Sequence, residues 1–294
     1  MQSREQAVMP AERYVESKGL RARFLAAGET GPPGVLIHGL GASAEIWSAN
    51  LSALSERHRV YAPDLPGFGR TEKPGWMDYS PTAYSRFLLD FLAAIGIGRA
   101  SLVGHSLGGG VALRAVLDDP GCAERLVLVS SAGLGRDVSL PLRVASLPWF
   151  DRVFFKPSLE VFIHFLHRLV YDPGTVTPGF ARLYYDLFFQ PGSIRAFTGI
   201  LRAIATLRGA RPGVLGAIRE GLVTIAVPTL ILWGRQDRIL PVRQGIDAAG
   251  RIPGARLHIF ERCGHMPNIE HPEEFNRLVL EFLAEDRPKA KGER

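Results

Sequence analysis

Short apolar segments alternate with helix-like segments along most of this chain, and that alternation limits the folds it can adopt. Runs rich in Val, Ile and Leu occupy residues 35–38, 100–104, 125–131 and 228–234. Residues with helical spacing separate the first of these runs, at 42–54, 81–95 and 108–118. Strands that are apolar on both faces and separated by helices are typical of a parallel sheet covered on both sides. The sequence therefore predicts an α/β fold.

Further segments complete the predicted sheet and its cover. Residues 11–27 contain two strand-like runs joined by a Lys-Gly turn, which indicates an antiparallel hairpin at the start. Additional strands are expected at 58–64 and 255–260, and a last helix at 271–284. We therefore expect a mostly parallel, eight-stranded sheet flanked by helices.

The alternation stops between residues 134 and 220, where no strand is apparent. Six prolines divide this stretch into several helical pieces, namely Pro148, Pro157, Pro173, Pro178, Pro191 and Pro212. An insertion after the sixth strand would lie over the carboxyl edge of the sheet as a helical cap, or lid. The expected organisation is a core made from residues 1–133 and 221–294, with the cap of residues 134–220 between its two parts.

The composition excludes several classes of protein. Of the 294 residues, 46% are hydrophobic and 22% are charged, which excludes disordered, collagen-like and coiled-coil chains. With only Cys122 and Cys263, no disulfide framework is indicated, and the first residues lack the apolar region of a secretory signal. No apolar stretch is long enough for a transmembrane segment. These features predict a cytoplasmic protein and leave open a homo-oligomer.

The net charge of +6 would suit a nucleic-acid partner, but its distribution along the chain does not. The 30 arginines and 5 lysines are scattered, and no nucleic-acid-binding motif accompanies them. Residues 134–220 hold 11 basic and 6 acidic side chains, so most of the excess lies in the predicted cap. We therefore expect no nucleic-acid partner. The cap charge either forms a solvated face or attracts a substrate carboxylate.

One glycine-rich motif, Gly104-His105-Ser106-Leu107-Gly108, follows a predicted strand and opens a predicted helix. A serine in such a turn has an exposed hydroxyl, and small neighbours let the turn pack closely. The helix that follows directs the positive end of its dipole toward developing negative charge. A phosphate-binding loop is disfavoured, because the Gly-Lys-Ser/Thr ending and the dinucleotide glycine spacing are missing. Ser106 is the predicted nucleophile.

A serine nucleophile needs a base, and two residues near the end of the chain fit the requirement. Asp237 and His265 each come shortly after one of the last two predicted strands. The carboxyl ends of parallel strands share one crevice, so both side chains can meet Ser106. His265 would take the serine proton, and Asp237 would hold the imidazole in the required tautomer. Asp64 is a competing acid at another strand end, but its Pro-Asp-Leu-Pro-Gly context favours a role in organising that turn.

Acyl transfer also requires two convergent donors for a tetrahedral oxyanion. The backbone N–H of Leu107, directly after the predicted nucleophile, is one candidate. The backbone N–H of Leu40, in the glycine-rich turn after residues 35–38, is the other. Both donors belong to the main chain, so substitution of either side chain need not remove them.

The remaining histidines do not predict a metal site, and we expect neither a metal nor a cofactor. His164 and His167 lie one helical turn apart in the predicted cap, but they lack a third ligand, which favours a half-buried helix face. His38 and His105 lie inside the two glycine-rich turns, where they are expected to bond to the loop backbone.

Five segments carry a resemblance to a known superfamily. In chain order they are VLIHGLGAS, YAPDLPGFGRT, LVGHSLGGGVAL, LILWGRQDRILPV and CGHMPNIEHPEEF. In this combination the sequence resembles the α/β-hydrolase fold superfamily over nearly its whole length, apart from the cap. Haloalkane dehalogenases and epoxide hydrolases of that superfamily use an aspartate at the position of Ser106, so the resemblance is to its serine carboxylesterase and meta-cleavage-product-hydrolase branch. It implies a catalytic triad of Ser106, Asp237 and His265.

Two reactions fit that resemblance. The leading expectation is a serine hydrolase that cleaves carboxylic esters through an acyl-enzyme intermediate. The alternative is hydrolysis of a C–C bond in meta-cleavage products (2-hydroxy-6-oxo-dienoates), since the segments RLVYDPGTVTP and LWGRQDRILP resemble that family. That family has a tryptophan directly after the catalytic histidine, where this chain has Met266, and a cap arginine where a gapless reading places Tyr184. A perhydrolase and a non-catalytic ligand receptor are further alternatives.

The predicted cap is unusually aromatic. It holds 13 of the 27 aromatic side chains of the chain. Most of them are expected to form the core of the cap itself, and the others an apolar roof over the bound molecule. The expected partner is therefore a small-molecule ester with an apolar acyl or aryl group.

Overall fold

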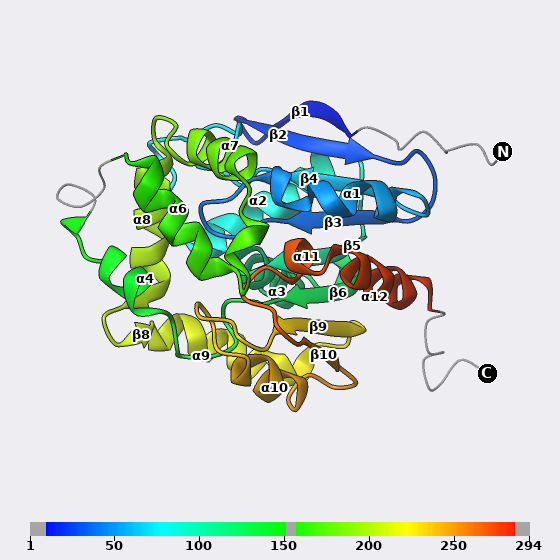
Figure 1. Cartoon of the computed structure of the whole chain (residues 1–294). Coiled ribbons are helices and arrows are strands. Elements are labelled where there is room, and N and C mark those ends of the chain that lie inside the picture. Colours follow the sequence, from blue (N-terminus) through cyan, green and yellow to red (C-terminus); the bar gives the residue numbers. More distant parts are fainter. Residues whose placement is uncertain (1–9, 151–156, 286–294) are drawn as a thin grey trace, which may run out of the picture.

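A computed structural model describes residues 10–150 and 157–285, and it confirms the predicted sheet (Figure 1). Eight strands lie in the order β1-β2-β4-β3-β5-β6-β9-β10. Only the pairs β1–β2 and β2–β4 are antiparallel, and the other pairs are parallel. The strand bounds are β1 Ala11–Ser17, β2 Leu20–Ala27, β3 Pro33–Ile37, β4 Arg59–Pro63, β5 Ala100–His105, β6 Ala123–Val129, β9 Thr229–Gly234 and β10 Arg256–Phe260.

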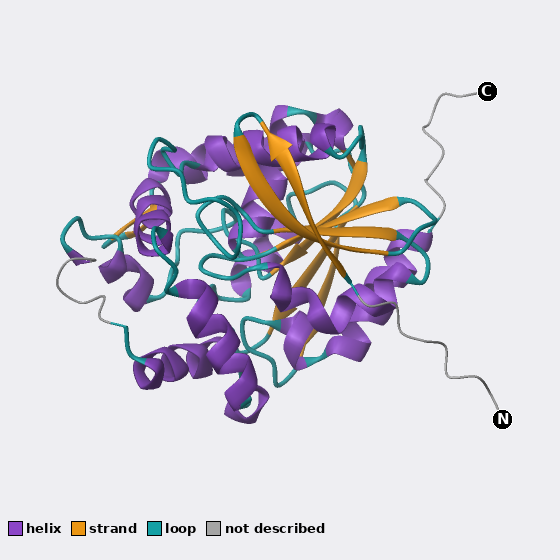
Figure 2. Cartoon of the chain, turned by 90° about the horizontal axis from the view of Figure 1, so that it is seen from above, coloured by secondary structure: helices purple, strands orange, loops and turns teal. Residues whose placement is uncertain are grey.

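Helices cover both faces of this sheet (Figure 2). The core helices are α1 Ser48–Ser55, α2 Pro81–Ala94, α3 Leu107–Asp118, α10 Arg243–Ala249, α11 Pro267–Glu270 and α12 Pro272–Ala284. Local sequence sets some of their ends. The Ser80 hydroxyl accepts a hydrogen bond from the Ala83 N–H at the start of α2, and Pro81 occupies the first helical position. The helix predicted at 42–54 is instead a 3₁₀ turn, Ala44–Trp47, followed by α1.

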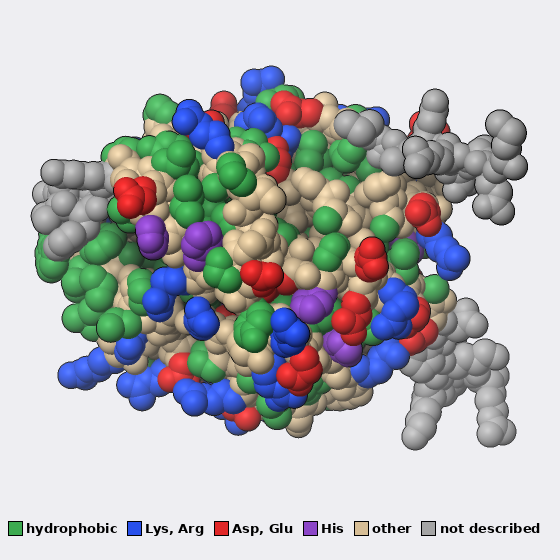
Figure 3. Space-filling view, in the orientation of Figure 1, with side chains coloured by type: hydrophobic (Ala, Val, Ile, Leu, Met, Phe, Trp, Pro, Cys, Tyr) green, Lys and Arg blue, Asp and Glu red, His purple; other side chains and the backbone are tan. Residues whose placement is uncertain are grey.

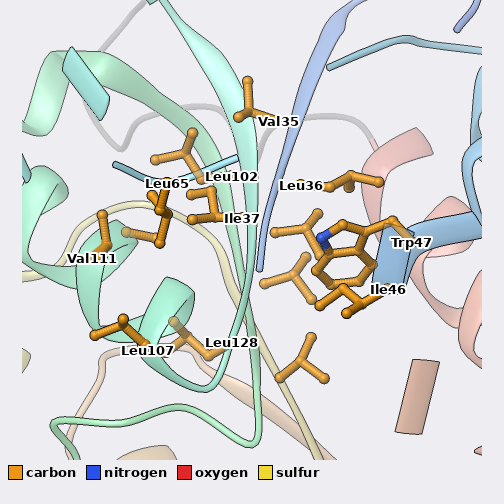
Figure 4. Close-up of a cluster of buried hydrophobic side chains, with 14 of the residues drawn as sticks. Val35, Leu36, Ile37, Ile46, Trp47, Leu65, Leu102, Leu107, Val111 and Leu128 are labelled. Carbon is orange, nitrogen blue, oxygen red and sulfur yellow. The ribbon is translucent and has the colours of Figure 1, made fainter. Parts of the chain in front are cut away.

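The central strands are buried on both faces, which explains why their sequences do not alternate between apolar and polar residues. In Figure 4, Leu36 of β3 lies on the side of Trp47, whereas Ile37 lies on the side of Leu65 and Val111. All five side chains are at most 1% exposed. Successive residues of β3 thus pack into two apolar layers, one on each face of the sheet.

The segment of residues 134–220, called here the cap segment, is mainly helical and lies beyond one end of the sheet, at the left of Figure 1. Its helices include α4 Leu140–Ala145, α6 Leu159–Leu169, α7 Pro178–Phe188 and α8 Ser193–Ile204, and α9 spans Pro212–Gly221. Pro178 and Pro212 occupy first-turn positions, as prolines can at a helix start. Residues 151–156, including the aromatic Phe154 and Phe155, lie outside the described residues.

The expectation of no strand in the cap segment is wrong in one place. Two-residue strands β7, Ala205–Thr206, and β8, Gly209–Ala210, pair antiparallel directly after α8. Gly209 has a φ of 107°, which a side chain would strain, so the tight reversal depends on glycine there. Strands this short have no periodicity that a sequence pattern can reveal.

The surface in the orientation of Figure 3 differs between the two parts of the chain. Hydrophobic side chains gather on the left of this face, over the cap helices, whereas charged side chains are mixed over the remainder. No helix within residues 10–150 and 157–285 is long and apolar enough to cross a membrane.

Candidate active site

Ser106 lies in the sharp turn between β5 and α3, with φ 52° and ψ −114°. This backbone conformation is rare for a residue with a side chain and costs about 1–3 kcal/mol. The surrounding backbone holds it: the Ser106 carbonyl accepts from the N–H groups of Gly109 at 3.1 Å and Ala132 at 2.9 Å. A Cβ on Gly104 would collide with the Gly108 carbonyl. The glycines of the motif therefore let the turn close, as the sequence predicts.

The three side chains predicted to act together are in contact. The Ser106 Oγ lies 3.0 Å from His265 Nε2, and His265 Nδ1 lies 2.7 Å from Asp237 Oδ2. The Asp237 carboxylate accepts a hydrogen bond from the Nδ1–H group, and this tautomer leaves Nε2 unprotonated and facing the serine hydroxyl. Such an arrangement can remove the proton from Ser106.

The second carboxylate oxygen of Asp237 accepts two backbone hydrogen bonds. Its Oδ1 accepts from the N–H groups of Ile239 at 2.8 Å and Leu240 at 2.9 Å, so the carboxylate cannot rotate freely. The side chains of Asp237 and His265 are at most 5% exposed. The imidazole is therefore held by a fixed, largely buried partner.

Sheet topology brings these distant residues together. Ser106 follows β5, Asp237 follows β9, and His265 follows β10, and these strands run parallel in one half of the sheet. Several hydrogen bonds join the loops after β9 and β10, among them one from the Gln236 N–H to the Cys263 carbonyl at 2.9 Å and one from the Cys263 N–H to Gln236 Oε1 at 3.0 Å. The acid and the imidazole therefore share one rigid pair of loops.

Leu40 and Leu107 both line a cavity with Ser106. Leu107 is the first residue of α3, where an N–H group has no partner within the helix. Leu40 lies in the turn after β3, and His38 braces that turn. His38 Nε2 accepts from the Leu65 N–H at 2.8 Å, so Nδ1 carries the proton and donates to the Gly39 carbonyl at 2.7 Å.

Asp64, the competing acid, belongs to a different cluster. Its carboxylate accepts from the N–H groups of Ala44 at 2.7 Å and Arg70 at 2.8 Å, and it pairs with the buried guanidinium of Arg23 at 3.2 Å. Burial raises the pKa of Asp64 to about 6, against the opposing effect of Arg23. Asp64 therefore organises its turn, as predicted, and the structure brings Asp237 rather than Asp64 to His265.

Burial keeps two further histidines neutral. Desolvation lowers the pKa of His38 to about 4 and the pKa of His105 to about 3. His105 Nε2 donates to the His265 carbonyl at 2.8 Å and so supports the loop that carries the imidazole. Both side chains bond to loop backbone, as predicted, and the Ser106 hydroxyl bonds to His265 rather than to either of them.

Two cavities meet at Ser106 and Leu40. The first, called here the inner chamber, has a volume of about 90 Å³ and extends away from His265 between the core and α9, along Val138, Leu215 and Ile218. The second, called here the histidine chamber, has a volume of about 60 Å³ and is also lined by His265, Met266 and Tyr184.

Both chambers are apolar. No Arg, Lys, Asp or Glu is present among the described residues that line either of them. A wider hollow of about 260 Å³ shares Leu142, Phe162, Phe165, Phe188 and Phe197 with the histidine chamber and leads outward between α4, α6 and α7. The site therefore presents apolar walls to whatever binds beside Ser106.

The part of the chain that the structure describes contains no group of three His, Cys, Asp or Glu side chains that could hold a metal ion. His164 and His167 lie with ring centroids 6.4 Å apart on α6, and His164 Nδ1 bonds to the carbonyl of Glu160 in its own helix. His167 is half-buried, as predicted for this helix face, whereas His164 is exposed.

Comparison with known proteins agrees with this geometry. The model of a family described as "alpha/beta hydrolase fold" matches residues 32–272. The chain belongs to the α/β-hydrolase fold family. The hydrolase is 33% identical over 277 residues to a 2-hydroxymuconate semialdehyde hydrolase of Pseudomonas putida, covering 93% of this chain and 94% of that one.

Two solved structures extend the comparison. A meta-cleavage product hydrolase (CumD) of Pseudomonas fluorescens IP01 is similar to the hydrolase with a TM-score of 0.80 at 33% identity, covering 92% of this chain and 97% of the other. A membrane phospholipase A, a bacterial virulence factor, is similar with a TM-score of 0.76 at 28% identity, covering 93% and 86%. Proteins whose names denote different reactions thus share this fold, and the local site has to distinguish between the reactions.

Sequence reasoning did not single out Glu270, which lies close to the His265 loop. Its carboxylate accepts from the Gly264 N–H at 2.9 Å and from the Met266 N–H at 3.2 Å, on either side of His265. The only sequence signal was an acidic residue five positions after the predicted base. An isolated acidic residue at that distance does not belong to a recognised motif.

Proposed function

We propose that the hydrolase cleaves carboxylic esters with apolar groups, through an acyl-enzyme formed on Ser106. One observation carries the proposal: the Ser106 Oγ, bonded to a His–Asp pair, lies where two apolar chambers meet. An ester presents one electrophilic carbon between two substituents. A nucleophile between two apolar compartments suits that shape.

In the first half of the proposed reaction, the Ser106 Oγ attacks the ester carbonyl carbon while His265 Nε2 takes the hydroxyl proton. The carbonyl oxygen becomes an oxyanion, which we assign to the backbone N–H groups of Leu40 and Leu107. Asp237 stabilises the imidazolium that forms. Collapse of the tetrahedral intermediate breaks the bond to the alcohol oxygen, and His265 returns its proton to that oxygen.

In the second half, a water molecule attacks the acyl carbon after the alcohol has left. His265 removes a proton from this water and gives it to Ser106 Oγ as the acid departs. The balance is one ester and one water consumed, with one carboxylic acid and one alcohol released. No step needs a cofactor.

In this proposal, the position of His265 determines which chamber holds the alcohol and which holds the acyl group. The leaving alcohol must receive its proton from His265 Nε2, so it belongs in the histidine chamber. The acyl group then occupies the inner chamber, which His265 does not line. The small inner volume, about 90 Å³, favours short or medium acyl groups.

The cap segment would act as the roof and lid of this site, with residues 1–133 and 221–294 forming the core beneath it. Phe162 and Phe188 of the cap segment, with ring centroids 5.3 Å apart, line the histidine chamber and the hollow outside it. A lid must move to admit substrate. Because Cys122 and Cys263 are buried free thiols, we also place the reaction in a reducing compartment, the cytoplasm.

The second candidate is hydrolysis of a C–C bond in 2-hydroxy-6-oxo-dienoates. The names of the relatives from Pseudomonas favour it, because they denote hydrolases of such compounds. Local residues favour the ester instead. Met266 and Tyr184 line the histidine chamber where that family's tryptophan and arginine are expected, and among the described residues that line it none is a cation for a dienoate carboxylate.

The test is a panel of purified substrates measured with the wild type and with Ser106→Ala. Steady-state kcat/KM is determined for p-nitrophenyl esters from acetate to palmitate and for a 2-hydroxy-6-oxo-dienoate. Turnover of short or medium esters that disappears in the variant supports the proposal. Cleavage of the dienoate without ester turnover would favour C–C bond hydrolysis over ester hydrolysis. Turnover of neither substrate by a protein that a fluorophosphonate fails to label would favour a non-catalytic receptor.

A further inference from the structure

Three backbone N–H groups and one thiol converge on the Glu270 carboxylate. Oε1 accepts from Gly264 at 2.9 Å and from Met266 at 3.2 Å, and Oε2 accepts from Tyr171 at 2.6 Å and from Gly264 at 3.0 Å. The Cys263 Sγ lies 3.7 Å from Oε1. An ionised carboxylate can accept all these bonds at once, because both oxygens have free lone pairs.

These donors come from two parts of the chain. Gly264 and Met266 are the residues on either side of His265, whereas Tyr171 belongs to the cap segment just after α6. A second bond crosses the same boundary, from the His265 N–H to the Leu169 carbonyl at 2.6 Å. The cap segment is therefore bonded to the backbone of His265 directly, and to both of its neighbours through Glu270.

The two segments also touch without any intervening side chain. A Cβ on Gly264 would lie 2.6 Å from the Leu169 carbonyl oxygen and 2.8 Å from the Tyr171 nitrogen. On its other side, the His265 carbonyl accepts from His105. The peptide groups around His265 are thus fixed by the core on one side and by the cap segment on the other, and Glu270 bridges the two.

We infer that Glu270 is a positioning residue, which clips the cap segment at residues 169–171 to the loop that carries His265. This role rests on the proposed function of His265 as the base for Ser106. Glu270 touches no reacting atom. It would act by holding the imidazole at bonding distance from the Ser106 hydroxyl while the rest of the cap segment moves, so that lid opening occurs away from α6.

The inference predicts a loss in the chemical step rather than in binding. Glu270→Ala removes every acceptor, whereas Glu270→Gln keeps one oxygen and places an amide N–H against a backbone donor. We expect kcat to fall at least tenfold in Glu270→Ala with KM changed less than threefold, and to fall by a smaller factor in Glu270→Gln. The matched control is Glu273→Ala, an exposed acidic residue on the next helix, which should retain wild-type kinetics.

A second measurement does not depend on the substrate. A fluorophosphonate labels Ser106 only as fast as His265 activates it, so the labelling rate of folded Glu270→Ala should fall by a factor similar to the fall in kcat. If the wild type cleaves neither substrate class, the proposed function fails while the labelling rates still test Glu270. If either variant has a lower Tm but wild-type kcat and labelling per folded molecule, Glu270 has only a structural role and the inference is overturned. Glu270→Gln decides the matter if Glu270→Ala does not fold.

Discussion

The core and the cap segment contribute to the site in opposite ways. Core residues meet through short, directional bonds between charged or polar groups, such as the 2.7 Å contact of His265 with Asp237. The cap segment contributes apolar rings in contact with one another, such as Phe180 and Tyr184, whose ring centroids lie 4.1 Å apart. Directional contacts tolerate little displacement, whereas stacked rings can shift and still pack.

This difference between the core and the cap segment suggests how one fold can serve several reactions. In the proposed mechanism, the core holds the nucleophile and the base through directional bonds, and the cap segment lines the space beside them. A 2-hydroxymuconate semialdehyde hydrolase, a meta-cleavage product hydrolase and a membrane phospholipase A are all similar to this chain, so the walls of the site rather than the fold must distinguish substrates. Substitutions in the core and in the cap segment should therefore have different effects.

The largest effect is expected for Ser106→Ala, which removes the nucleophile from the core. In a serine hydrolase, the loss of the nucleophile lowers kcat by roughly 10⁵- to 10⁶-fold. Steady-state hydrolysis of the best ester found in the panel measures the loss. Ser131→Ala, at the end of the neighbouring strand, is the matched control and should retain activity within a few-fold. Wild-type turnover in Ser106→Ala would place the chemistry elsewhere.

The next effect separates the two buried acids of the core. Asp237→Asn should lower kcat roughly 10⁴-fold, because the amide stabilises the wrong imidazole tautomer. Asp64→Asn should lower stability more than kcat, because Asp64 accepts from the Ala44 and Arg70 N–H groups, whereas Asp237 is the acid in contact with His265. Kinetics and urea unfolding of both variants give the comparison. Equal losses of kcat would contradict the assignment of Asp237.

A smaller effect is expected from a substitution in the wall of the inner chamber, where the cap segment meets the core. Ile218 of α9 lines the inner chamber, and its methyl group would lie 2.9 Å from a Cβ placed on Gly133. Ile218→Trp should fill this chamber and lower kcat/KM for octanoate relative to acetate by about tenfold, equivalent to about 1.4 kcal/mol. The ratio for two alcohols on the same acyl group should not change. A change in alcohol preference instead would reverse the assignment of the chambers.

The last prediction concerns stability in acid rather than catalytic rate. The pKa of His38 is lowered to about 4 in the folded chain, whereas the unfolded chain binds the same proton near pH 6.5. This contribution to stability is therefore complete above pH 6.5 and is lost as the pH falls toward 4. Between pH 7 and pH 5, these two pKa values correspond to a loss of about 2 kcal/mol.

His38→Gln tests this, because the glutamine oxygen can still accept from the Leu65 N–H without titrating. Urea unfolding at pH 7 and pH 5 should show a smaller acid loss in His38→Gln than in the wild type. His164→Gln, an exposed change on α6, should keep the wild-type pH dependence. An identical acid loss in all three proteins would show that His38 is not a source of it.

Most of the core could be predicted from sequence because local patterns and backbone physics agree there. Apolar runs with helices between them require a sheet buried on both faces, and the glycines around Ser106 fit only a tight strand-to-helix turn. The 3₁₀ turn at Ala44–Trp47 was missed because Asp64, a residue distant in the sequence, accepts the Ala44 N–H. The β7–β8 pair was missed because two-residue strands have no detectable period.

The sequence by itself determined the sheet, the nucleophile turn and the order in which Ser106, Asp237 and His265 occur. The sequence context of Asp64 already favoured Asp237 as the partner of His265, and the tertiary structure supplied the contact itself, 2.7 Å between His265 Nδ1 and Asp237 Oδ2. The tertiary structure also decided the division of the site into two chambers and the convergence of Tyr171, Gly264 and Met266 on Glu270. The contact of Tyr171 with Glu270 joins residues that are 99 positions apart, and the chambers depend on the space left between packed side chains. Neither property is encoded in any local run of residues.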